Sequence, residues 1–165
     1  MILGVSTATY TFVHVLISFI GIGSGVAVMW GLLAGKRLDG ISAIFLTSTA
    51  LTSLTGFAFP VEHLMPSHVV GIISLVILAL VFPARYIFRL SGAWRSVYVI
   101  GAAIAFYLNV FVLVVQSFEK VPALKALAPT QKEPPFLIAQ LTVLVIFVGV
   151  TFLATKKFQL EPARV

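Results

Sequence analysis

Residues 57–74 read FAFPVEHLMPSHVVGIIS, a short polar segment with two prolines between two long apolar runs. The prolines at positions 60 and 66 interrupt any helix that would otherwise join the two runs. The segment also carries two of the three histidines, His63 and His68. It therefore predicts a tight connection between two helices, and the other elements can be placed relative to it.

The composition of the chain is that of a membrane protein. Of 165 residues, 60% are hydrophobic and 10% are charged, with a mean hydropathy of +1.12. A soluble domain usually carries about 25% charged residues. A small core cannot bury this much apolar surface, whereas a bilayer accepts it. The sequence contains no cysteine, which excludes disulfides, thiolate metal sites and iron–sulfur clusters.

Five apolar runs are long enough to cross the bilayer, since a helix needs about 20 residues to span roughly 30 Å of hydrocarbon. Strands of a membrane barrel would alternate in polarity over about 10 residues, and these runs do not. We therefore expect an all-α fold, a single domain over residues 1–165, with five transmembrane helices. The expected spans are residues 11–33, 41–59, 67–88, 94–117 and 136–155.

Two features interrupt this pattern of spans. Pro83 lies near the far end of the third run, where we expect it to kink or end the helix. The loop before the fifth run predicts a short interfacial helix at about residues 121–127, which the prolines at 129, 134 and 135 keep from continuing. The first run has no preceding Lys or Arg and no convincing cleavage site, so we expect a retained helix rather than a secretory signal.

Lysine and arginine predict the orientation, because cations gather in the cytoplasmic loops of membrane proteins. Eight cations fall on one side and three on the other, which predicts an outer N-terminus and an inner C-terminus in a membrane of the bacterial inner-membrane type. The +6 net charge is thereby explained by membrane anchors and not by nucleic acid. The eight are Lys36, Arg37, Arg85, Arg89, Arg95, Lys156, Lys157 and Arg164; the three are Lys120, Lys125 and Lys132.

Counting span lengths from these anchors brings ligand-capable side chains to one depth near the outer face. The candidate metal ligands are His14, Glu62, His63, His68 and Glu119. Imidazoles with carboxylates suit zinc or copper, and His14 with His68 could be the axial ligands of a b-type haem. Two alternatives stay open. The histidines could simply lie at the headgroup level, or they could contact a quinone or relay protons.

Three polar side chains are expected inside the bundle: Thr52, Asn109 and Gln116. Asn109 is the amide placed deepest in the membrane, and it should find a hydrogen-bond partner on another helix. Gly21 and Gly25, four residues apart, predict a close helix–helix contact on the face that carries His14.

The segment Pro66-Ser67-His68-Val69-Val70-Gly71, a histidine at the start of a span, resembles the bundle cytochromes b. Those proteins hold haem between histidines on facing membrane helices, so the resemblance implies one outer haem at most, on His14 and His68. As a whole, the chain is similar to small multi-pass proteins of the bacterial inner membrane, a resemblance that implies location and no chemistry.

Three functions follow as hypotheses. The first is a redox or metal-handling membrane protein with an outer histidine site, serving electron transport or metal handling. The second is an accessory or assembly subunit of a larger membrane complex, and the third is a small channel or transporter that forms a homo-oligomer. No hydrolase or kinase constellation can be named, so catalytic residues stay unassigned.

Overall fold

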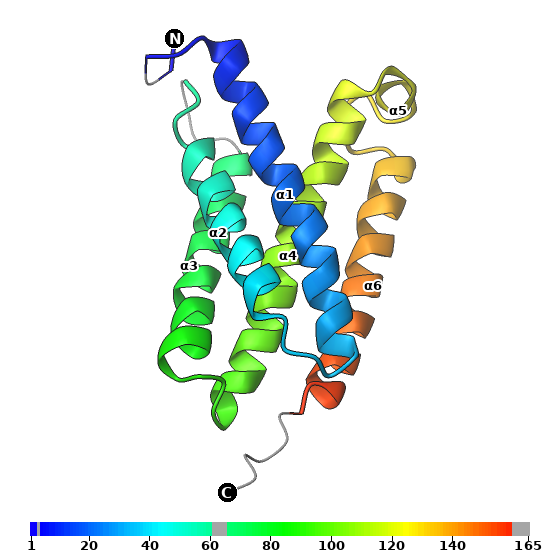
Figure 1. Ribbon diagram of the computed structural model, residues 1–165. Coiled ribbons are helices and arrows are strands. Elements are labelled where there is room, and N and C mark those ends of the chain that lie inside the picture. Colours follow the sequence, from blue (N-terminus) through cyan, green and yellow to red (C-terminus); the bar gives the residue numbers. More distant parts are fainter. Residues whose placement is uncertain (3, 61–65, 160–165) are drawn as a thin grey trace, which may run out of the picture.

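The computed structural model describes residues 1–2, 4–60 and 66–159, which form a bundle of helices (Figure 1). The bundle contains no strand within these residues, and Ile2 and Val5 form an isolated bridge. The helices are α1 (Thr7–Leu33), α2 (Asp39–Gly56), α3 (Pro66–Phe82), α4 (Ala93–Lys120), α5 (Pro122–Leu127) and α6 (Pro134–Lys157). A π-helical turn, η1 (Pro83–Ile87), continues α3. The all-α prediction is confirmed.

Helix α4 lies at the centre of the bundle and packs against α1, α2, α3 and α6. Helix α2 packs against α1 on one side and α3 on the other, and α6 packs on α4 and α1. Consecutive long helices run in opposite directions, and α5 lies across the end of the bundle where α1 begins (Figure 1). The end of α2, the start of α3 and the loop before α6 therefore lie at that same end, which we call the outer end after the orientation that the loop cations predict.

Among the described residues, four helices are long and apolar enough to cross a membrane: Thr7–Leu33, Ser67–Ile87, Ala93–Lys120 and Pro134–Lys157. They correspond to the first, third, fourth and fifth of the expected spans. Helix α2 differs because Asp, Ser and Thr account for eight of its 18 residues. Its packing against three other helices explains this composition, since only part of its surface, including Ile44, Leu51 and Leu54, is exposed.

The expected breaks appear where the prolines stand. Regular α-helix ends at Phe82, and the π-helical turn begins at Pro83, whose ring cannot fit an uninterrupted α-helix. The short helix expected at about residues 121–127 is present as α5. At the start of α1, the Ser6 side chain accepts a hydrogen bond from the Thr9 amide at 3.1 Å and caps the helix.

Close helix contacts form at small residues. An added Cβ at Gly25 would lie 2.5 Å from a ring carbon of Phe106 on α4, and one at Gly101 would overlap Val81 of α3. The fully buried Phe45 and Leu46 of α2 and Tyr98 of α4 fill the space between these contacts. The closeness of α1 to α4 therefore depends on a glycine at position 25.

We expect Gly25→Ala to lower the free energy of unfolding by about 1–3 kcal/mol, because the new methyl group displaces the Phe106 ring in a packed interior. Gly23→Ala is the matched control, since a Cβ there meets open space and alanine favours the helix. Thermal unfolding in detergent measures both. Equal destabilisation by the two changes would contradict this account of the α1–α4 contact.

Candidate functional site

His14 lies on α1 against the C-terminal end of α2. Its Nδ1 is 2.8 Å from Thr55 Oγ1, and its ring meets Phe59 edge-on at a centroid distance of 5.2 Å. Tyr10, one helical turn earlier, donates its hydroxyl hydrogen to the Thr55 carbonyl at 2.9 Å and also packs edge-on against Phe59. The outer end of the α1–α2 interface is thus a half-buried niche of one imidazole, one phenol and one phenyl ring.

The hydrogen bonds of Thr55 define the tautomer of a neutral His14 ring. The Thr55 hydroxyl donates to the Leu51 carbonyl of its own helix at 2.7 Å. Its oxygen must then accept from His14, so the hydrogen of the imidazole lies on Nδ1. The Nε2 lone pair is left without a hydrogen-bond partner within residues 1–2, 4–60 and 66–159, and it is free to bind a ligand.

His68 approaches a different face of α2. It lies near the start of α3, is 9% exposed, and packs against the Phe57 ring at a centroid distance of 5.5 Å. One turn later, Gly71 lies beside Phe57 and the Ser53 carbonyl. Because His14 meets the face of Thr55 and Phe59, the end of α2 separates the two imidazoles. The structure does not bring them face to face.

One expected carboxylate ligand, Glu119, lies within the described residues. Glu119 is exposed near the end of α4, and Glu62 and His63 lie outside the described residues. Within the part of the chain that is described, no group of three or more His, Cys, Asp or Glu residues could hold a metal ion.

A polar seam continues from His14 toward the middle of the bundle. The Ser18 hydroxyl lies 3.4 Å from Thr52 Oγ1, and Asn109 of α4 donates to Thr49 Oγ1 at 2.9 Å. An added Cβ at Gly21 would lie 3.3 Å from Ser48 Oγ, so α1, α2 and α4 meet closely at this level. The seam joins three helices through hydrogen-bonded side chains.

Of the polar side chains expected inside, Thr52 and Asn109 lie in this seam. Gln116 is half-buried on α4. A more buried amide belongs to Gln140 of α6, which is 8% exposed and donates to the Phe111 carbonyl at 3.2 Å. Its place one turn into the last apolar run is the sequence signal for this contact.

A second polar cluster lies at the opposite end, where we expected only anchoring cations. Arg85 is 2% exposed, and its guanidinium donates to Asp39 Oδ1 and lies 4.9 Å from the centre of the Tyr98 ring. Tyr98 donates to Ser42 Oγ at 3.1 Å. The cluster fastens η1 and α4 to the start of α2. Asp39, the acidic residue that opens α2 among nearby cations, was the sequence signal for it.

We expect the Asn109–Thr49 bond to contribute a coupling free energy of about 0.6 kcal/mol, and at most about 1.7, as interhelical bonds in membranes do. A double-mutant cycle of Asn109→Ala and Thr49→Val, read by unfolding in detergent, measures it. Thr142→Val is the control, because that exposed hydroxyl bonds only the Ile138 carbonyl of its own helix. A coupling indistinguishable from zero would show that the bond does not join the helices energetically.

Comparison of the chain with models of protein families, with curated proteins and with solved structures gives no significant match. Any function assigned to this protein therefore rests on the arrangement of its own side chains.

Proposed function

We propose that the protein is an integral membrane protein of five spans, with its N-terminus outside and its C-terminus inside, that binds a transition metal at its outer end through His14. The observation that carries this proposal is the hydrogen bond that fixes the hydrogen of His14 on Nδ1 and leaves Nε2 free. Metal-binding histidines commonly donate their second ring nitrogen to a neighbouring oxygen, which orients the ring and raises its basicity.

The sequence between α2 and α3 contains the other expected donors, Glu62 and His63, which lie outside the described residues. The chain leaves the His14 niche at Phe59 and reaches His68 nine residues later, and Glu62 and His63 stand between them in the sequence. Two imidazoles, His14 and His63, with the carboxylate of Glu62 suit zinc or copper. Because His14 and His68 meet different faces of α2, this arrangement favours a metal ion over a haem held between both rings. Copper would serve electron transfer, and zinc or copper would serve metal handling.

We expect the purified protein to bind zinc or copper, and His14→Ala to lose that binding. Thr55→Val removes the acceptor that orients the ring, and should weaken the affinity about 10–100-fold. Elemental analysis and titration with each metal measure both effects. Ser18→Ala is the control, because Ser18 lies one turn further along α1 and bonds the His14 backbone carbonyl, not its ring.

Metal binding that survives in His14→Ala would contradict the proposal. An absorption spectrum of the same samples tests the haem alternative. A Soret band that depends on both His14 and His68 would show that the ligand is haem and not a single metal ion. If the folded protein contains no metal and no absorbing cofactor, the accessory role described next is the function that remains.

An accessory or assembly subunit is the second candidate, and the interhelical hydrogen bonds favour it. His14, Asn109, Tyr10 and Tyr98 each bond a residue of α2, so the same side chains serve helix packing. In that case His14→Ala would destabilise the bundle without loss of a cofactor, and the protein would co-purify with larger membrane subunits. A channel through a single chain is less favoured, because Gly21 and Gly25 bring α1 close to α2 and α4.

The five-span topology is supported by the cations at the two ends of the bundle. Lys36 and Arg37 follow α1 and Lys156 and Lys157 end α6, whereas Lys120, Lys125 and Lys132 lie around α5 at the outer end (Figure 1). Helix α2 is about 27 Å long at 1.5 Å per residue, close to the hydrocarbon thickness. Ser42, Ser48, Thr49 and Ser53 are buried and Thr47 is exposed, so most of the polar side chains in the middle of α2 would not meet lipid in a crossing helix.

Because the sequence has no cysteine, single cysteines report the topology directly. We expect Ala58→Cys and Thr130→Cys to react with a membrane-impermeant maleimide from outside the cell. Ala34→Cys and Ser91→Cys should react only after the membrane is permeabilised. Labelling of Ala34→Cys and Ala58→Cys from one side would show that α2 does not span.

A further inference from the structure

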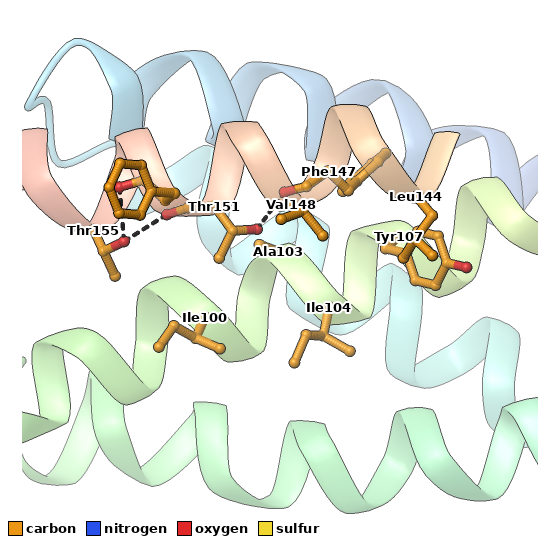
Figure 2. A pocket seen from close by; sticks show the side chains of 10 residues that line it. Ile100, Ala103, Ile104, Tyr107, Leu144, Phe147, Val148, Thr151 and Thr155 are labelled. Carbon is orange, nitrogen blue, oxygen red and sulfur yellow. Dashed lines mark hydrogen bonds between the residues drawn. The ribbon is translucent and has the colours of Figure 1, made fainter. Parts of the chain in front are cut away.

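A groove runs between α4 and α6 on the surface of the bundle, far from the His14 niche in the sequence and built from other helices (Figure 2). It is open along one side and has a volume of about 360 Å³. Helix α4 contributes Ile100 and Ile104, and α6 contributes Leu144, Val148 and Phe152, all of them exposed. The groove is thus a hollow in the surface that would face acyl chains.

The lining offers almost nothing to a polar ligand. Thr155 donates its hydroxyl hydrogen to the Thr151 carbonyl at 2.6 Å, and Thr151 donates to the Phe147 carbonyl at 2.6 Å, as the dashed lines in Figure 2 show. Tyr107 presents its ring, which packs against Phe147 at a centroid distance of 5.6 Å. A groove with these properties fits an alkyl chain.

The length of the groove matches the acyl chain of one leaflet. From Leu144 to Thr155 the groove follows α6 for about 16 Å, close to half of the roughly 30 Å hydrocarbon core. An apolar groove of this length, open to the surrounding lipid along one side, suits an acyl chain of one leaflet.

A cation stands at the headgroup end. Lys156 follows Thr155 directly, and its Nζ lies 4.3 Å from the centre of the Phe152 ring, which lines the groove. This is also the end that carries Lys36, Arg37, Arg89 and Arg95 (Figure 1). Asp39 is the one acidic residue at this end among the described residues, and it is engaged by Arg37 and Arg85. The positive charge there is largely uncompensated.

We propose that the α4–α6 groove binds one anionic phospholipid, with an acyl chain along the groove and the phosphate at Lys156. The groove holds the acyl chain of any phospholipid equally well. The specificity for a negatively charged headgroup comes from the positive charge of Lys156. The lipid belongs to the leaflet at the C-terminal end of α6. This site is independent of the His14 niche, so either can fail without the other.

Native mass spectrometry of the full chain, titrated with phosphatidylglycerol or with phosphatidylcholine of the same acyl chains, tests the headgroup. We expect one phosphatidylglycerol to bind more tightly than phosphatidylcholine. Lys156→Ala should weaken phosphatidylglycerol about fivefold, the effect of one lysine near a charged surface, and leave phosphatidylcholine unchanged. Lys157→Ala is the matched control, because it removes the same charge about 100° around the helix. Equal effects of the two changes, or no preference for phosphatidylglycerol, would overturn the proposal.

The acyl-chain part is tested by filling the groove. Val148→Trp should weaken both lipids, whereas Leu141→Trp, on an exposed part of α6 outside the groove, should weaken neither. Soluble glycerol 3-phosphate should not displace the lipid, because the groove and not the phosphate alone holds it. Unchanged binding in Val148→Trp, displacement by glycerol 3-phosphate, or a change in oligomeric state in place of lipid loss would each contradict the site. Unaltered circular dichroism spectra establish that the variants fold.

Discussion

Hydrogen bonding in the absence of water is the constraint on which this bundle depends. A polar group in hydrocarbon must find its partner within the protein, since no solvent is present to replace it. Helix α2 carries seven serine and threonine residues, more than any other helix, and several of them bond to carbonyls of their own helix or to side chains of α1 and α4. Its place between three other helices follows, because on the lipid surface those groups would face acyl chains.

The same constraint connects the two ends of the molecule. At the outer end, Thr55 holds the His14 ring, and at the inner end Asp39 holds the buried guanidinium of Arg85. Between them, Phe45 and Phe106 pack edge-on at a centroid distance of 6.1 Å and form an apolar layer. Helix α2 thus bears a hydrogen-bonded imidazole contact at one end and an ion pair at the other.

The surface that would face lipid needs no hydrogen-bond partners. Lipid is as apolar as the side chains that meet it, so α6 exposes leucine, valine and phenylalanine along most of its length without penalty. What differs along that surface is shape and charge. A hollow with a cation at its end, as between α4 and α6, can therefore order a particular lipid where a flat apolar surface cannot.

Apolar run length, proline positions and loop cations were readable from the sequence, because each acts locally on helix formation or on the cost of entering the bilayer. They predicted five spans, of which four correspond to long apolar helices among the described residues, together with the break at Pro83 and the short α5. The depth of each side chain in the membrane could be predicted by counting residues from the same cations, so His14 and His68 were both expected near one end. Only the tertiary structure decided that they meet different faces of α2 and that Arg85 is buried on Tyr98. Rotation about a helix axis and the choice of neighbour depend on packing between distant segments, which no local pattern encodes.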